Sequence, residues 1–338
     1  MNKVTALKVA ELAGVSQSAV SRVFTPGASV STKTALKVRK AAQELSYRPN
    51  VLARSLITGK SRIIGLVVAY LDNYFYPAAL EKLSNSLKEE GYHVLVFMAS
   101  NDDQSTEQVI EELLDYQVDG IITASVGISN DLTARCEAAG VPVVLFNRTQ
   151  DKASHSAVTS DNFLGGQTAA RFLYEAGHKR IAYIGGWAGA STQRDREAGF
   201  RFGLKNADAI LFAHALGNFS TDIAKAVARN MFSGSIKPDA VFVATDHMAF
   251  AVMDVLRSEL DLSVPKDVSV VGYDDVPPAS WAAYDLTTLR QRSNLMVDQT
   301  VNLMIDKIRD PDVASKHIKI LSPLIVRGSA KIPKGWST

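Results

Sequence analysis

Cysteine is almost absent from the sequence and no long apolar run occurs, and both absences narrow the class of protein. A single cysteine, Cys136, among 338 residues excludes an internal disulfide and is typical of a reducing compartment. The longest apolar run, Ile63–Leu71, is far shorter than the roughly 20 residues of a membrane-spanning helix. The N-terminus lacks the apolar segment of a secretory signal peptide. We therefore expect a cytoplasmic protein with no membrane partner.

Motifs for metal binding and for several kinds of catalysis are also missing. The six histidines are scattered, and Asp246 and His247 are adjacent rather than spaced as metal ligands on one helix face. No nucleophile elbow and no P-loop occurs. The segment GGWAGA (185–190) has G-G-x-x-G spacing and not that of a dinucleotide site, so we expect a loop that lines a ligand cleft. We expect no metal, no cofactor and no enzyme activity.

Positive charge is concentrated near the N-terminus. Residues 1–60 contain ten Lys and Arg residues and two acidic residues, a net charge of +8. The rest of the chain contains 27 Lys and Arg residues and 33 acidic residues, a net charge of −6. A basic head on an acidic body is the pattern expected when only the head meets a polyanion such as DNA. A disordered basic tail fits less well, because the head is rich in Ala, Val and Leu at helical spacing.

Three short helices are predicted in the head, over residues 6–13, 17–24 and 32–45. Gly14 suits a tight turn, Ser16 is a good N-cap, and Ser31 or Thr32 suits the start of the third helix. The residues expected to face inward are Val9, Ala10, Leu12 and Ala13, then Ala19, Val20, Val23 and Phe24, then Leu36, Val38, Ala41, Ala42 and Leu45.

The polar face of the second helix carries amide, hydroxyl and guanidinium groups and no carboxylate. Its residues are Gln17, Ser18, Ser21 and Arg22. An ordinary solvated face is the alternative interpretation, but such a face usually includes Glu or Asp. In a basic head, this face predicts a helix-turn-helix whose second helix enters the DNA major groove. Gln17 suits adenine and Arg22 suits guanine, and the neighbouring serines suit phosphate oxygens.

From residue 63 onward, apolar strands alternate with amphipathic helices. The expected strands are 63–69, 93–99, 120–125, 141–147, 158–162, 181–186, 210–216, 240–245, 268–273 and 318–326. Such alternation predicts parallel sheets covered by helices, and the number of strands favours two doubly wound lobes over one wide sheet. We expect the lobe boundary near residue 160 and a crossing back near residue 290.

Two adjacent carboxylates, Asp274 and Asp275, follow one of these strands. A catalytic pair would need a histidine or further metal ligands at suitable spacing, and none is found. Neighbouring carboxylates often cap loops, which is the alternative interpretation. In an open α/β sheet, however, ligands bind at the carboxyl ends of the strands, so Asp274 is expected to contact a ligand.

Several motifs in this order resemble the LacI/GalR (lactose-repressor) family of bacterial transcription regulators, over essentially the whole chain. They are VAELAGVSQSAVSRVF, YRPNVLARSL, VDGII, SDNFLGG, GHKRIAYIGG, TQRDREAGF, PDAVFVATDHMAFAVM, VPKDVSVVGYDD and LTTLRQ. The resemblance implies a helix-turn-helix domain over 1–48, a hinge helix and linker over 49–61, and a core over 62–338 whose two lobes are of periplasmic-binding-protein type. It also implies a homodimer that binds a pseudo-palindromic operator and is expected to act as a repressor.

The resemblance assigns DNA contacts to the head and to the hinge. The implied residues are Thr5, Ser16, Gln17, Ser18, Ser21, Arg22, Ser31, Asn50, Ala53, Arg54 and Leu56. Leu56 matches the family's apolar wedge, which unstacks and kinks a base step from the minor groove. A hinge helix of about eight residues is marginal alone, so it should order only beside its twin on DNA. The alternative for Leu56 is a core residue of the body.

The resemblance also places an effector pocket between the lobes. The implied residues are Asp72, Phe75, Tyr76, Asn147, Arg148, Thr192, Arg196, Phe219, Thr245 and Asp274. Arg196 and Asp274 are expected to bind vicinal hydroxyls of a sugar or sugar acid, and Phe75, Phe219 and Trp187 to stack on its apolar face. Thr245 stands where the family usually has asparagine, and Ser293 where it often has an aromatic residue.

An effector that changes the lobe arrangement should change operator affinity, by linkage. The C-terminal segment SAKIPKGWST has no leucine heptads, so a dimer is expected and not a tetramer held by a terminal coiled coil. The alternative functions are a sugar-binding protein or a sugar-modifying enzyme without a DNA role.

Overall fold

The computed structural model describes residues 4–25, 27–48, 60–69, 71–100, 103–150 and 155–337. The chain forms two compact units, Met1–Ser61 and Arg62–Thr338. Among the described residues, no helix has both the length and the apolar character needed to cross a membrane.

The first unit contains three helices, α1 (Ala6–Ala13), α2 (Gln17–Val23) and α3 (Thr32–Glu44). Gly14 ends α1 with a left-handed backbone (φ 65°), a conformation that favours glycine, and this residue turns the chain into α2. The three helices bury a small apolar core made of Val9, Ala10, Ala13, Val20, Val38, Ala41 and Ala42.

Two leucines predicted to face this core are exposed instead. Leu12 is 48% exposed and Leu36 is 65% exposed. At 3.6 residues per turn, Leu36 falls on the side of α3 opposite to Val38 and Ala41, and Leu12 lies on the flank of α1. The apolar character of the two leucines suggested burial, but their helical positions prevent it.

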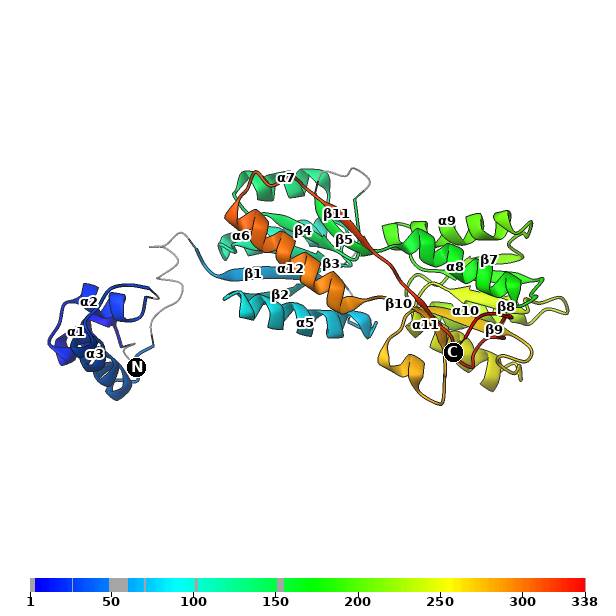
Figure 1. The fold of residues 1–338 in the computed structure, drawn as a ribbon, viewed down its shortest axis with the longest axis horizontal. Coiled ribbons are helices and arrows are strands. Elements are labelled where there is room, and N and C mark those ends of the chain that lie inside the picture. The colour runs from blue at the N-terminus through cyan, green and yellow to red at the C-terminus, as the bar shows by residue number, and fades with distance from the viewer. Residues whose placement is uncertain are drawn as a thin grey trace. The chain divides into compact units, whose positions relative to one another are not determined.

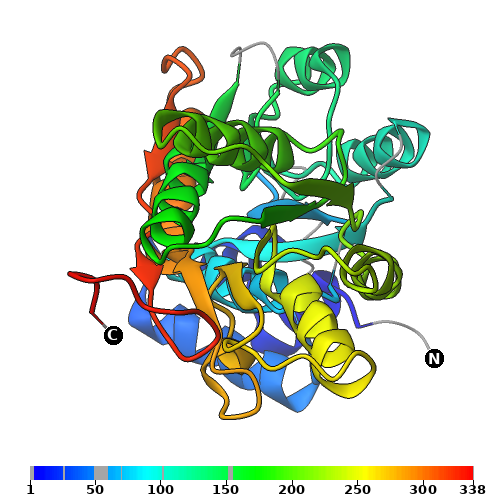
Figure 2. The same cartoon turned by 90° about the vertical axis from the view of Figure 1, so that its right-hand side faces the viewer.

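The second unit contains two six-stranded sheets whose helices lie on both faces (Figures 1 and 2). The first sheet has the strand order β11-β5-β4-β3-β1-β2 and defines lobe 1, and the second has the order β12-β10-β9-β8-β6-β7 and defines lobe 2. All pairs are parallel except the pair of β10 with β12. The prediction of two doubly wound, parallel lobes is confirmed.

The elements of lobe 1 are β1 (Ile63–Val68), α5 (Phe75–Glu89), β2 (His93–Met98), α6 (Asp103–Asp115), β3 (Gly120–Ala124), α7 (Asn130–Ala138), β4 (Val143–Phe146), β5 (Ser156–Ser160), α12 (Ser293–Arg309) and β11 (His317–Ile320). Those of lobe 2 are α8 (Asn162–Glu175), β6 (Ile181–Gly185), α9 (Ser191–Asn206), β7 (Ala213–Leu216), α10 (Thr221–Phe232), β8 (Ala240–Val243), α11 (Asp246–Ser258), β9 (Ser269–Asp274), the 3₁₀ helix η1 (Pro277–Ser280), β10 (Thr287–Arg290) and β12 (Leu324–Ile325).

The described chain passes between the lobes three times, after β5, after β10 and between β11 and β12. The last crossing corrects the prediction of one strand over 318–326. Pro323 lies inside that stretch and has no N–H for a sheet ladder, so the strand divides between the two sheets. Its carbonyl accepts a hydrogen bond from the backbone N–H of Arg290, the last residue of β10, at 2.8 Å.

Central strands of both sheets are buried along their whole length, as parallel strands covered by helices on both faces must be. The edge strand β2 differs, because Val96 and Met98 remain 50% and 49% exposed. An exposed apolar edge strand is an unusual feature for a monomer.

Candidate functional site

The first candidate site is the exposed polar face of α2. Gln17, Ser18, Ser21 and Arg22 are all exposed, and Val20 of the same helix is buried in the three-helix core. The Oγ of Ser16 accepts a hydrogen bond from the backbone N–H of Ala19 at 3.3 Å and so fixes the start of α2. The short helix therefore presents a donor-rich face, without carboxylates, on a packed scaffold.

Thr5 and Ser31, which precede α1 and α3, are also exposed. The Oγ of Ser31 accepts from the backbone N–H of Thr34 at 3.2 Å, so this hydroxyl also serves as a helix cap. The remaining residues predicted to contact DNA lie outside the described part of the chain; they are Asn50, Ala53, Arg54 and Leu56.

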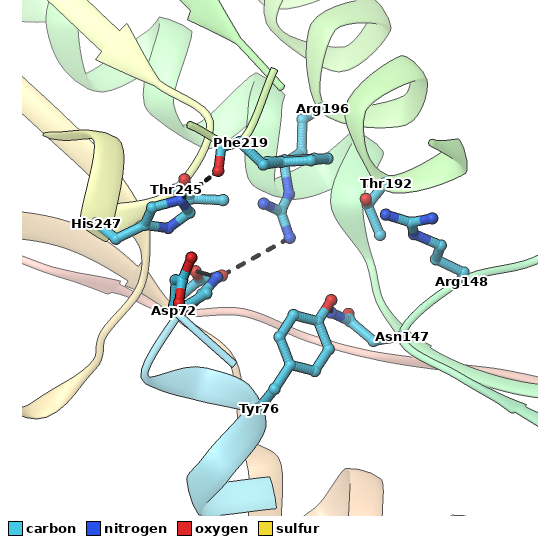
Figure 3. Close-up of a pocket in the computed structure, with 11 residues that line it drawn as sticks. Asp72, Tyr76, Asn147, Arg148, Thr192, Arg196, Phe219, Thr245 and His247 are labelled. Atoms are coloured by element: carbon cyan, nitrogen blue, oxygen red, sulfur yellow. Dashed lines mark hydrogen bonds and ion pairs between the residues drawn. The ribbon is translucent and has the colours of Figure 1, made fainter. Parts of the chain in front are cut away.

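The second candidate site is a cavity between the two lobes, with a volume of about 420 Å³ that includes its opening to solvent (Figure 3). Clefts of this size hold small metabolites. Its lining residues are Asp72, Asn73, Tyr76, Asn147, Arg148, Thr192, Arg196, Phe219, Thr245, His247 and Asp274.

The strand ends of both sheets bring these residues together. Asp72 follows β1, Asn147 follows β4, Thr245 follows β8 and Asp274 ends β9. This is the edge of an open α/β sheet at which ligands bind. Asn147, Phe219 and Asp274 have positive φ angles of 64°, 57° and 128°. Strained backbone of this kind is concentrated at functional sites.

Arg196 is held rigidly at the back of the cavity. Its Nε donates to Asn162 Oδ1 at 2.8 Å, its Nη1 donates to the carbonyl of Ala244, and its guanidinium lies 3.6 Å from the centre of the Tyr273 ring. Only Nη2 faces a lining residue, Asp274, at 3.9 Å. Nε and one N–H of Nη1 are therefore used within the protein, while Nη2 and the second N–H of Nη1 remain as donors toward a ligand.

Asp274 links the lobes across the cavity. Its Oδ2 accepts from Asn73 Nδ2 of lobe 1 at 2.9 Å, and its Oδ1 accepts from Gln291 Nε2 at 2.6 Å. Gln291 lies in the crossing segment between β10 and α12, and its Oε1 accepts from Ser160 Oγ at the end of β5. Burial raises the pKa of the Asp274 carboxyl, and the charge of Arg196 opposes that shift.

Asp246 is a second buried carboxyl behind the cavity. Its Oδ2 accepts from the backbone N–H of Val276 at 3.0 Å, and Thr288 Oγ1 lies 2.6 Å from its Oδ1. Burial, and next the charge of Asp274, raise the pKa of Asp246 to about 8. At neutral pH the carboxyl therefore holds a proton. Thr245 precedes α11, and Asp246 is its first residue.

Asp246→Asn is expected to flatten the pH dependence of stability. Because the folded pKa of Asp246 lies above the unfolded value near 4, its contribution is fully present at lower pH and is lost as the pH rises toward 8, with a slope of up to about 1.4 kcal/mol per pH unit. An asparagine mimics the protonated carboxyl and removes that loss. Urea midpoints measured from pH 5 to pH 8 test this, with Asp254→Asn, an exposed change on the same helix, as the control. Parallel profiles of wild type and Asp246→Asn would contradict it.

Three buried polar atoms of the lining have no hydrogen-bond partner within the described chain. They are Asn147 Oδ1, Thr245 Oγ1 and His247 Nδ1. Buried polar atoms are almost always hydrogen-bonded in folded proteins, and leaving one unsatisfied costs about 1–3 kcal/mol. Their gathering around one cavity indicates that a polar ligand completes them.

The cavity lining departs from the predicted pocket at several positions. Phe75 does not line it, because its ring stacks on Phe146 at 6.1 Å and packs into the core of lobe 1. The loop 185–190 does not line it either, and Trp187 lies beside Arg148 with 5.7 Å from the guanidinium to the ring centre. Ser293, at the start of α12, accepts a hydrogen bond from Lys82 Nζ at 2.8 Å outside the lining.

Asn73 and His247 line the cavity and were not predicted. Asn73 Oδ1 accepts from the backbone N–H of Phe75 at 3.0 Å, so this residue both starts α5 and holds Asp274. A polar residue directly after a buried strand was the available signal for it. His247 lies in the first turn of α11, where its adjacency to Asp246 was considered only for metal binding. Within the described residues, no group of His, Cys, Asp and Glu side chains could hold a metal ion.

A helical unit with an exposed donor-rich face and a two-lobed core with a polar cleft define a ligand-responsive DNA-binding protein. Residues 7–50 match the family described as bacterial regulatory proteins, lacI family, and residues 170–330 match the periplasmic binding protein-like domain. The ribose operon repressor of Escherichia coli K12 is 31% identical, over 95% of this chain and 98% of its own length.

Solved structures agree with these matches. The lac repressor dimer bound to operator and the anti-inducer ONPF is 28% identical with a TM-score of 0.88, over 97% of this chain and 99% of its own. The complex of the transcriptional regulator CelR with cellobiose is 30% identical with a TM-score of 0.74, over 97% and 100%. The chain belongs to the LacI family of bacterial regulatory proteins. It is a DNA-binding transcriptional regulator and not an enzyme, which confirms the resemblance seen in the sequence.

Proposed function

We propose that this protein is a cytoplasmic repressor whose affinity for a pseudo-palindromic operator is set by a small sugar or sugar derivative in the cleft between its lobes. The cleft carries this proposal, because it gathers unsatisfied buried polar atoms and charged side chains from both lobes. Relatives named for ribose and solved with cellobiose support a sugar as the effector class.

The proposed operator contacts come from the head. Gln17 and Arg22 read base edges in the major groove, and Ser18 lies with them on the same exposed face. Phosphate oxygens are contacted by four exposed hydroxyl groups, those of Thr5, Ser16, Ser21 and Ser31. The hydroxyls of Ser16 and Ser31 also cap helices. Asn50, Ala53, Arg54 and Leu56 are proposed to form the hinge contacts in the minor groove.

The proposed effector contacts come from Asp72, Tyr76, Asn147, Arg148, Thr192, Arg196, Phe219, Thr245 and Asp274. Carboxylates and amides beside guanidinium groups suit a ring that carries several hydroxyls, since each hydroxyl both donates and accepts. Phe219 supplies an apolar surface for one face of that ring.

A homodimer is part of the proposal. The edge strand β2 leaves Val96 and Met98 half exposed, and an apolar edge of this kind is normally covered by a partner. The lac repressor structure with operator is a dimer. Two copies of the head would match the two half-sites of a pseudo-palindrome.

A gel-shift titration of the full-length protein tests the function. We expect a DNA selected from random duplexes to be a pseudo-palindrome, and the logarithm of its affinity to fall linearly with the logarithm of salt concentration, as phosphate contacts require. The same selection with the core alone, residues 61–338, is the control and should yield no enriched sequence. Failure of the full-length protein to enrich any sequence would contradict the proposed function and favour a sugar-binding protein without a DNA role.

A further inference from the structure

His247 has an unusual position in the cleft. The residue is only 6% exposed and lies in the first turn of α11, where its side chain faces the cavity together with Asp72 and Tyr76 of lobe 1 (Figure 3). Its Nε2 lies 3.1 Å from the backbone carbonyl oxygen of Phe219. A carbonyl oxygen only accepts hydrogen bonds, so Nε2 carries the proton of the ring.

That contact fixes the chemistry of the other ring nitrogen. With the proton on Nε2, the neutral imidazole presents Nδ1 as an acceptor with no proton. Nδ1 is buried and has no partner within the described chain. Asn147 is similar, because its Nδ2 donates to Tyr76 Oη at 3.0 Å and leaves Oδ1 as an unsatisfied acceptor.

The charges around His247 come from several elements. Asp72 follows β1, Asp274 ends β9, Arg196 projects from α9 and Asp246 precedes His247 on α11. Burial lowers the pKa of His247, although the hydrogen bond to Phe219 and the charges of Asp274 and Asp72 oppose that shift. The lining as a whole contributes two carboxylates and two guanidinium groups, which balance each other.

We propose that His247 determines effector specificity as a neutral acceptor, whose Nδ1 receives a hydrogen bond from a hydroxyl or N–H donor of the ligand. This inference rests on the proposed function, and it adds that the ligand is an uncharged, donor-rich molecule such as a neutral sugar. Protonation of Nδ1 removes the acceptor, so effector affinity falls in acid by up to tenfold per pH unit below the pKa of His247.

The state of the ring is measured without any ligand. Side-chain ¹⁵N–¹H correlation spectra of the full-length protein, assigned with His247→Gln, should show Nε2 protonated and Nδ1 unprotonated at pH 7.5. A protonated Nδ1 at pH 7.5 would overturn the inference and leave the proposed function untouched.

Ligand selectivity is measured by thermal shift with D-ribose, D-glucose, D-galactose, cellobiose, D-gluconate and D-glucuronate at pH 7.5 and pH 5. We expect a neutral sugar to stabilise the wild type more strongly than the acids do, and more at pH 7.5. His247→Leu should weaken the binding of that sugar at least tenfold. His247→Gln, whose amide oxygen accepts without titrating, should keep much of the affinity and lose most of the pH dependence. Asp254→Asn, an exposed change on α11, is the control.

Three further outcomes are decisive. An unchanged pH dependence in His247→Gln, or tighter binding of the sugar acids than of every neutral sugar, would overturn the role of His247 while sustaining a sugar effector. Stabilisation by none of the six compounds at either pH would contradict the sugar effector itself, and this inference with it.

Discussion

Replacing Arg22 by alanine should lower the ratio of operator affinity to non-specific affinity by roughly 5- to 150-fold, about 1–3 kcal/mol. Arg22 is exposed on α2, a helix held by the buried Val20, so the change removes a base contact and leaves the scaffold intact. Non-specific binding depends on phosphate contacts and should change little. Fluorescence anisotropy with the selected operator and a scrambled duplex measures the ratio.

Arg39→Ala provides a matched control, because Arg39 is an equally exposed arginine on α3. Loss of this exposed cation should affect the binding of the operator and of the scrambled duplex to a similar extent, since a positive charge attracts the phosphates of any sequence. If the Arg22→Ala protein discriminates operator from scrambled DNA as well as the wild type does, Arg22 of α2 does not contribute to base recognition.

Changing Asp274 to asparagine should lower effector affinity by roughly 10- to 150-fold, the effect of about 1.5–3 kcal/mol expected for hydrogen bonds to a charged group. The carboxylate lines the cavity, and each of its oxygens accepts one amide hydrogen bond and retains a further lone pair for a ligand. Asp274→Asn removes the anion beside the buried Arg196, so a urea unfolding curve first checks that the variant folds. Operator binding without effector should then stay within a few-fold of wild type, because the change lies in the core. Isothermal titration calorimetry measures the effector affinity, and a gel-shift assay measures the operator affinity.

Asp254→Asn, an exposed carboxylate-to-amide change on α11, is the control and should leave both quantities unchanged. Asp274→Asn that binds effector as tightly as the wild type would show that this residue only joins the lobes. Arg196→Ala is a poor substitute for this experiment. It leaves the buried Asp274 without its cation and breaks the bonds to Asn162 and Ala244, so it should destabilise the core by about 3–5 kcal/mol.

The sequence predicted the alternation of elements well because burial on both faces makes parallel strands continuous apolar runs. The stretch 63–69 reads as a strand for this reason and is one, β1. The prediction failed where a crossing segment breaks the pattern. β10 (Thr287–Arg290) has two threonines facing buried polar partners and gave no strand signal, and Pro323 divides a stretch that looked continuous.

The cleft was predictable to the extent that strand ends reveal it. Asp72, Asn147 and Asp274 follow strands, and the resemblance added residues from helices, such as Tyr76 and Thr192. Whether an aromatic ring faces the cavity or the core depends on its rotation about the helix, and Phe75 was misplaced for that reason. Hydrogen-bond saturation is also invisible in a sequence, so neither the occupied nitrogens of Arg196 nor the free Nδ1 of His247 could be foreseen.

Reciprocal titration tests most directly whether effector binding in the core cleft changes the affinity of the head for operator DNA. Operator affinity is measured with and without saturating effector, and effector affinity with and without saturating operator, on one preparation of the full-length protein. We expect both affinities to change by the same factor, between about 5 and 150, as linkage requires. Operator affinity that stays the same at every effector concentration, while the effector binds the cleft, would contradict the account.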